Sequence, residues 1–298
     1  MKQFIPAPLR LQARLLQRHW RDRRRGHWAR FARPSQARLG GAPPGTSPPF
    51  QHQWDLVQPV PATQHSAQKI RNLAIALQRL NNVIIQPGQL LSFWHLVGPP
   101  TRRRGYGEAR GIVGDRLRSD IGGGLCQLSG MLYWLGLQAG MTVIERHPHS
   151  QDIYDDQSRY APLGSDATVV YGYKDLRLAN RLAVPLSMRF ELESQVRAQA
   201  PAQEPSQTPF LRLSLWAPRR LARQEVIFER DVFPQDGFGD GFVSDWEGEF
   251  GAELGGRADD AWGSRATGIW VRTLRCGTGQ GQVQAPEIVD ETFYRQYR

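Results

Sequence analysis

Residues 122–171 hold the side chains of this chain whose types and order suit nucleophilic catalysis. Cys126 follows three glycines and opens an apolar segment, two histidines stand at 147 and 149 after a short β-type run, and Asp166 comes later. Several cysteine hydrolases and transferases assemble a nucleophile, a base and an orienting group from separate elements in this way. The order therefore predicts a cysteine nucleophile, with a histidine as base and Asp166 as orienting group.

The glycine run before Cys126 favours a reactive thiol. The run consists of Gly122, Gly123 and Gly124. Because glycines lack a Cβ, such a run can turn tightly and expose backbone N–H groups. Cys126 then lies in the first turn of a helix that we expect to end near Leu137, where free N–H groups and the helix dipole favour the thiolate. The same N–H groups can serve as an oxyanion hole. The alternative is a buried structural cysteine, since free cysteine often packs as a small hydrophobe.

Spacing alone does not choose between the two histidines. His147 and His149 alternate in an extended segment, so we expect both on one side of it, with Pro148 opposite. Asp166 can hold the imidazole tautomer, or it can be an ordinary turn residue after Gly164. Cys126 and the two histidines can also bind zinc, but no C-x-x-C or H-E-x-x-H pattern accompanies them. The sequence therefore predicts no metal and no cofactor.

The net charge of +10 comes from one end of the chain. Residues 1–38 hold eleven Lys or Arg residues and one acidic residue, Asp22, while residues 39–298 are balanced. Apolar residues recur at helical spacing between the arginines, at Leu9, Ala13, Leu16 and Trp20. The pattern predicts an amphipathic helix, and we favour its packing against the body with solvated arginines. Binding to an anionic membrane surface is the second interpretation, and no motif supports a specific nucleic acid.

The rest of the chain reads as an α+β fold with a mostly antiparallel sheet and a small β-rich C-terminal lobe. Apolar spacing predicts a helix over 67–81 in addition to the one at Cys126. We expect strands at 90–93, 142–144, 169–171, 183–193, 210–216, 225–230 and 268–274. The predicted divisions are a basic arm and linker at 1–49, a domain at 50–194, a linker at 195–209 and a lobe at 210–298.

Composition gives an expectation for location. No apolar run has the length of a transmembrane helix, and residues 1–38 lack the apolar core of a secretory signal. The only two cysteines, Cys126 and Cys276, make no disulfide framework. The sequence thus predicts a cytoplasmic protein, with the inner membrane face as the alternative.

The stretch from Asn72 to about Glu193 resembles the VanW family. The strongest block is Gly122-Gly123-Gly124-Leu125-Cys126-Gln127-Leu128-Ser129. Further matching residues include Asn81-Asn82, Leu91-Ser92-Phe93-Trp94, Gly105-Tyr106, Glu145-Arg146, His149-Ser150, Asp166-Ala167-Thr168 and Asp175-Leu176. The family pattern has a histidine at the place of His149 but varies at His147, so the resemblance selects His149 as the base.

The resemblance also implies a role in glycopeptide resistance or cell-wall metabolism. The first hypothesis for this role is a cysteine-dependent hydrolase or acyltransferase. Its catalytic residues would be Cys126, His149 and Asp166, and its partner a small or peptide-like cell-wall precursor. The second hypothesis is a non-catalytic binding module or a membrane-surface accessory protein. Under either hypothesis, the residues expected at the substrate are Gly122, Gly123, Gly124, Gln127, Ser129, Glu145 and Arg146.

Overall fold

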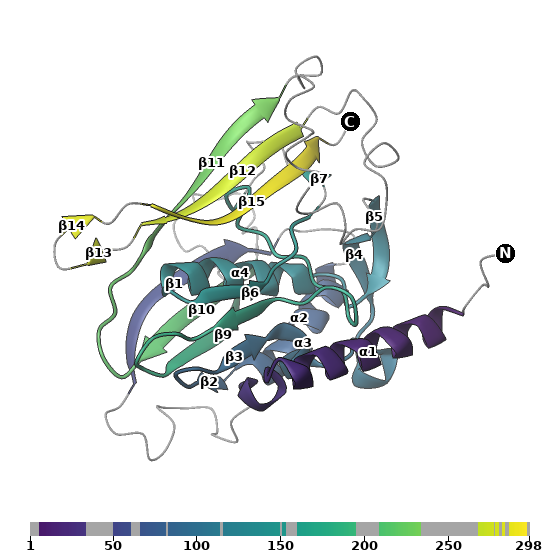
Figure 1. Cartoon of the computed structure of the whole chain (residues 1–298). Helices are drawn as coiled ribbons and strands as arrows, with labels where there is room; N and C mark the ends of the chain where they lie inside the picture. The colour runs from purple at the N-terminus through teal and green to yellow at the C-terminus, as the bar shows by residue number, and fades with distance from the viewer. Residues whose placement is uncertain are drawn as a thin grey trace.

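A four-stranded antiparallel sheet supports the middle of the molecule in the computed structural model (Figure 1). Its strands, in order across the sheet, are β1 (Gln51–Pro59), β10 (Pro209–Ala217), β9 (Leu186–Ser194) and β2 (Val83–Ile85). The structure describes residues 6–33, 50–60, 66–81, 83–113, 116–149, 151–152, 160–194, 209–233, 268–276, 278–279, 282–283 and 286–296. Strand β10 thus shares a sheet with β1 and β9, although the sequence assigns residue 210 to a separate lobe.

Two helices contact this sheet and carry much of the core. Helix α2 (Ser66–Leu80) contacts β9, and helix α4 (Leu125–Gln138) contacts β10 and α2. The buried side chains of α4 lie on nearly every side of the helix, because other elements surround it. Both helices confirm the sequence predictions, and the chain leaves α4 through Gly140, whose φ of +78° suits glycine.

Smaller elements connect the helices. A three-stranded antiparallel sheet has the order β3 (Leu90–Ser92), β8 (Arg177–Ala179) and β6 (Thr142–Glu145). Short helices follow β3, namely α3 (Phe93–Val97) and the 3-10 helix η2 (Arg102–Arg104). A hairpin of β4 (Glu108–Val113) and β5 (Arg116–Ile121) then leads directly into the glycine turn before α4.

The C-terminal strands form a second sheet, which contacts α4. Its order is β11 (Glu225–Phe233), β12 (Gly268–Cys276), β15 (Glu287–Gln296) and β7 (Gln151–Asp152), with only β7 and β15 parallel. A two-stranded ribbon extends from it, β13 (Thr278–Gly279) and β14 (Gln282–Val283). The Trp134 ring of α4 lies edge-on to the Phe228 ring of β11, at 6.2 Å between centroids. The mostly antiparallel α+β prediction is therefore confirmed.

One predicted strand is wrong. Residues 169–171 enter a turn, in which the N–H of Val170 and the carbonyl of Lys174 hydrogen bond at 2.9 Å. Gly172 has a φ of +83°, and a Cβ there would lie 2.4 Å from a methyl carbon of Leu11. Close packing beneath Leu11 therefore overrides the β propensity of these residues. The predicted linker residues 40–49 and 195–208 lie outside the described part of the chain.

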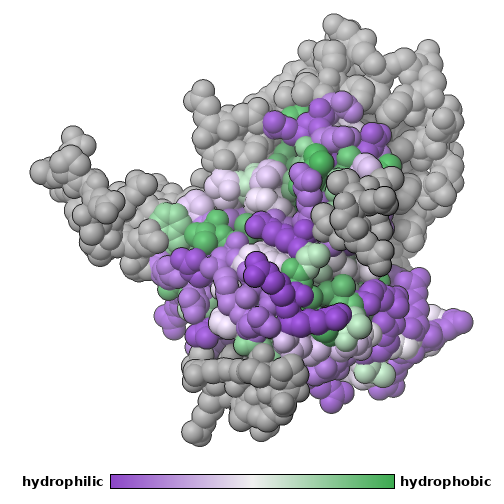
Figure 2. Space-filling view, turned by 90° about the vertical axis from the view of Figure 1, so that its left-hand side faces the viewer, coloured by the Kyte–Doolittle hydropathy of each residue, from purple (hydrophilic) through white to green (hydrophobic). Residues whose placement is uncertain are grey.

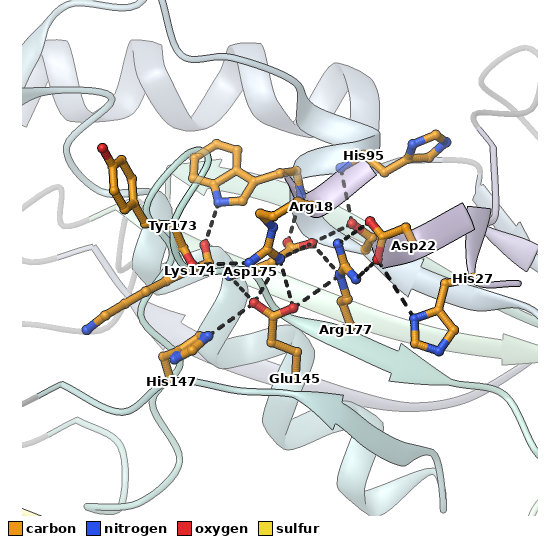
Figure 3. A network of polar contacts seen from close by, with 12 residues as sticks. Arg18, Asp22, His27, His95, Glu145, His147, Tyr173, Lys174, Asp175 and Arg177 are labelled. Carbon is orange, nitrogen blue, oxygen red and sulfur yellow. Dashed lines mark hydrogen bonds and ion pairs between the residues drawn. The ribbon is translucent and has the colours of Figure 1, made fainter. Parts of the chain in front are cut away.

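The basic arm forms helix α1 (Ala7–Arg24), which packs along the body (Figure 1). The short 3-10 helix η1 (Trp28–Arg30) follows it. Ion pairs fix the helix: Arg18 of α1 pairs with Glu145 at 2.8 Å, and Asp22 of α1 pairs with Arg177 at 2.6 Å (Figure 3). The predicted helix and its packing are confirmed, but the contacts come from residues outside the predicted apolar stripe.

Hydrophobic surface is divided on the face shown in Figure 2, where small hydrophobic patches are separated by hydrophilic residues. Within the described residues, no helix is long and apolar enough to span a bilayer.

Asn72 of α2 holds the glycine turn in place. Its side-chain N–H groups donate to the carbonyl oxygens of Gly107 and Gly123, each at 3.0 Å, and its oxygen accepts from the N–H of Gly107. The side chain is fully buried. Asn81 makes the analogous pair of bonds with the backbone of Phe190 in β9, away from the turn.

We predict that Asn72→Ala lowers the free energy of unfolding by about 3 kcal/mol, because it leaves buried backbone groups unpaired. Urea unfolding measures this loss. The variant should also slow alkylation of Cys126 by iodoacetamide at pH 7, since the turn no longer holds the start of α4. Asn81→Ala is the matched control and should lose stability without changing Cys126 alkylation. Equal alkylation in all three proteins would contradict the role of Asn72.

Candidate active site

The glycine turn delivers Cys126 to the first turn of α4. Gly124 is the N-cap residue with φ of +101°, and a Cβ on it would lie 2.8 Å from the side chain of Lys69. The N–H groups of Gly122 and Gly123 already donate to the carbonyls of Gly107 and Asp120. In the described part of the chain, the N–H groups of Gly124 and Cys126 have no acceptor. They are the donors that an oxyanion could use.

Cys126, His149 and Asp166 come together as the sequence order suggests. The His149 side chain lies close enough to the Cys126 thiol for the two groups to influence each other's ionisation, and the thiol donates to the carbonyl oxygen of Val169 at 3.9 Å. His149 donates from Nδ1 and from its backbone N–H to Oδ2 of Asp166, both at 2.7 Å. Because Nδ1 faces the carboxylate, Nε2 is the nitrogen left for the thiol.

The three groups shift one another toward their charged forms. Burial opposes ionisation of Cys126, but interaction with the neighbouring His149 lowers the pKa of the thiol below its ordinary value. Burial also opposes the charged imidazole, yet Asp166 and Cys126 raise the pKa of His149 to about 10. Arg146 and His149 outweigh burial at Asp166 and hold the pKa of its carboxyl far below the usual range. The arrangement therefore favours the thiolate, the imidazolium and the carboxylate over their neutral forms.

Arg146 fixes the aspartate from the other side. Its guanidinium is 2 % exposed and donates to Oδ1 of Asp166 at 3.1 Å and to the backbone oxygens of Asp166 and Gly164. Three residues of β15 also accept hydrogen bonds from Arg146: Nη1 donates to Oδ2 of Asp290 at 2.5 Å and to the Thr292 hydroxyl at 2.6 Å, and Nη2 donates to the Tyr294 hydroxyl at 2.9 Å. Tyr294 in turn donates to Oδ1 of Asp166 at 2.5 Å. The C-terminal sheet therefore supports Asp166 directly.

Ser129 and Gly130 hold α4 against the segment that carries Asp166. The Ser129 hydroxyl is buried and donates to the carbonyl of Ala167 at 2.6 Å. A Cβ on Gly130 would lie 3.5 Å from the carbonyl of Ser165 and 3.6 Å from the Cα of Asp166. These contacts set the distance between the cysteine helix and the aspartate, so Ser129 is placed as a support and not at an open surface.

Two other residues of the predicted site, and the histidine that was not selected as the base, have partners elsewhere. The Gln127 amide nitrogen donates to the carbonyl of Pro59 in β1 at 2.8 Å. Glu145 pairs with Arg18 of α1, and His147 bonds to Glu145 at 3.1 Å (Figure 3). His149 bonds to Asp166 instead, so the two histidines belong to different clusters. Among the described residues, no three His, Cys, Asp or Glu side chains are grouped to hold a metal ion.

The sequence analysis missed the residues that β15 contributes, namely Asp290, Thr292 and Tyr294. They lie more than 120 residues after Asp166, in a segment that shows no motif. Their alternation along β15 is the only local signal, since every second residue of a strand faces the same side.

The fold and site define a class: an α+β protein with a part-buried Cys–His–Asp cluster at the start of a helix. Residues 68–199 match the model of the VanW family, described as VanW like protein, and this part of the chain belongs to that family. The chain is 32% identical over 116 residues to the vancomycin B-type resistance protein VanW of Enterococcus faecalis, covering 39% of this chain and 42% of that protein.

A second relative is the uncharacterized protein YoaR of Bacillus subtilis, which is 33% identical over 127 residues, covering 42% of this chain and 40% of that protein. The chain thus matches about two fifths of the length of each of these curated relatives. No solved structure matches the chain. The matched stretch includes Cys126, His149 and Asp166 but ends before β15.

We predict that Tyr294→Phe lowers the free energy of unfolding by about 1–2 kcal/mol, because the part-buried carboxylate of Asp166 loses a hydrogen-bond donor. Urea unfolding at pH 7 checks this value. Tyr106→Phe is the matched control, since the Tyr106 hydroxyl is also buried but has no partner in the described residues. That variant should be neutral or slightly more stable. If the two variants are equally stable, the hydroxyl of Tyr294 does not support Asp166.

Proposed function

We propose that this protein acts in cell-wall metabolism related to vancomycin resistance, as a cysteine-dependent hydrolase or acyltransferase. The substrate would be an amide or peptide bond of a cell-wall precursor. The observation that carries the proposal is the placement of the Cys126 thiol beside the His149 imidazole, which a hydrogen bond to Asp166 orients. The name of the E. faecalis relative supplies the biological setting.

The first chemical step follows from the charges at the site. The Cys126 thiolate attacks the carbonyl carbon of the amide, and the N–H groups of Gly124 and Cys126 donate hydrogen bonds to the oxygen on which negative charge develops. The carbon–nitrogen bond then breaks, and the His149 imidazolium gives its proton to the leaving amine. The product of this step is a thioester on Cys126 and a free amine.

The second step releases the acyl group. Neutral His149 removes a proton from water, which attacks the thioester and yields a carboxylic acid together with the restored thiolate and imidazolium. If an amine attacks in place of water, the same step forms a new amide and the protein is a transferase. Asp166 keeps Nδ1 protonated in both steps, so Nε2 exchanges the proton.

The competing function is a binding module without catalysis. In that case the glycine turn and the two free N–H groups would hold a carboxylate or phosphate of the ligand, and the thiol would have no chemical role. The two functions differ in what happens to a precursor when Cys126 is replaced.

We predict that the full chain converts muramyl peptide precursors, seen by mass spectrometry as loss of an amine fragment with gain of water or of a second amine. Cys126→Ala should abolish the conversion, and His149→Ala should slow it by about 10³-fold. Cys276→Ala is the matched control and should react like the parent, because Cys276 is buried in β12.

Calorimetry with the same precursors separates the two functions. If the parent and Cys126→Ala bind a precursor equally well and neither protein converts it, the enzyme hypothesis is contradicted and the binding module is favoured. A parent protein that neither binds nor converts any precursor would overturn the cell-wall assignment itself.

A further inference from the structure

Helix α1 has two different faces, and only one of them contacts the body. The inner face carries Leu11 and Leu15 against Gly172, together with the paired charges of Arg18 and Asp22. These four positions recur every three or four residues, so they lie on one side of the helix. Packing and ion pairs therefore hold α1 in a fixed orientation on the protein.

The outer face exposes large apolar side chains. Leu9 is 54 % exposed, Leu16 is 71 % exposed and Trp20 is 61 % exposed. Their spacing of seven and four residues places them in one stripe, opposite the inner face. Exposing three such residues in a row is costly in water, and it is a feature of surfaces that bind another phase or molecule.

Positive charge surrounds this stripe. Exposed arginines of α1 flank it, namely Arg10, Arg14, Arg21, Arg23 and Arg24. The one acidic residue in the helix, Asp22, is buried against Arg177 and does not offset them. The Arg24 guanidinium also lies 4.6 Å from the centre of the Trp20 ring, so a cation directly contacts the aromatic end of the apolar stripe.

We infer that the outer face of α1 binds the surface of an anionic lipid bilayer. The apolar stripe would lie among the acyl chains near the headgroups, and the flanking arginines would contact lipid phosphates. The helix would lie parallel to the membrane, with the body behind it. Tryptophan and arginine suit this position because each has an apolar part and a polar end.

The charge and the exposed apolar residues of α1 favour a lipid surface over a second copy of the chain or a nucleic acid. A second copy of the chain would bring its own exposed arginines to the contact, and the two sets would repel. A nucleic acid would use the arginines but would gain little from Leu16 or Trp20. A lipid surface uses both features. The inference does not depend on the chemistry of Cys126.

Sedimentation of the full chain with lipid vesicles tests the inference. We expect the protein to bind vesicles of phosphatidylcholine with 30 mol% phosphatidylglycerol, to bind pure phosphatidylcholine weakly, and to be released as salt rises to 0.5 M. Leu16→Ser/Trp20→Ser should reduce binding by about tenfold or more. Ile288→Ser, which removes another exposed apolar residue on β15, should bind like the parent.

A pair of charge variants completes the test. Arg10→Gln/Arg14→Gln should reduce binding to the anionic vesicles by about tenfold, whereas Arg219→Gln/Arg220→Gln removes the same charge from an exposed turn and should change little. Circular dichroism checks that α1 is retained in each variant. Unchanged binding after loss of Leu16 and Trp20, no binding to anionic vesicles, or equal effects of the two arginine pairs would overturn the inference.

Discussion

The part-buried carboxylate of Asp166 makes the interactions on which the site depends. Its Oδ2 accepts two N–H groups of His149, and its Oδ1 accepts from Arg146 and Tyr294. A buried carboxylate is stable only when charged or hydrogen-bonded partners replace water. Meeting that requirement brings together the end of β6, the C-terminal strand β15 and the segment after Gly164. The position of His149 relative to Cys126 follows from this arrangement.

Two neighbouring residues, Glu145 and Arg146, connect the N-terminal helix and the C-terminal sheet to the region around Asp166. Glu145, at the end of β6, binds Arg18 of the N-terminal helix, and Arg146 binds Asp290 and Tyr294 of the C-terminal sheet. Successive side chains of a strand point to opposite faces, so one short segment can serve both clusters. Burial opposes the charge of Glu145, but hydrogen bonding to His147 and the charges of Arg18 and Arg177 lower its pKa to about 2. This contribution to stability is present above the ordinary pKa of a glutamate and is lost as pH falls toward 2.

Local sequence signals predicted the helices α1, α2 and α4 and the order of the candidate site residues along the chain, but they did not predict the strands β1, β4, β5 and β15. The glycines before Cys126 and the apolar spacing after it were enough to predict α4, because a tight turn and one helical period are local properties. The convergence of Cys126, His149 and Asp166 needed tertiary contacts, above all those of Tyr294, which is 128 residues from Asp166. No pattern near either residue encodes that pair.

The N-terminal helix shows the same limit. Periodicity identified the stripe of Leu9, Leu16 and Trp20, but it did not tell which face packs, because Arg18 and Asp22 read as solvated charges until their partners in β6 and β8 are known. The turn at Val170 was missed for a related reason: its conformation is set by Leu11 packing on Gly172, a contact across more than 150 residues.

The pH dependence of Cys126 alkylation tests the central claim, which is that His149 holds the thiol as a thiolate. Iodoacetamide labelling is followed by peptide mass spectrometry from pH 4 to 10, with buried Cys276 as internal control. We predict that Cys126 reacts fully at pH values where an ordinary thiol, with a pKa of about 8.5, is mostly protonated. His149→Ala should move the profile to higher pH. An ordinary profile that His149→Ala leaves unchanged would contradict the account.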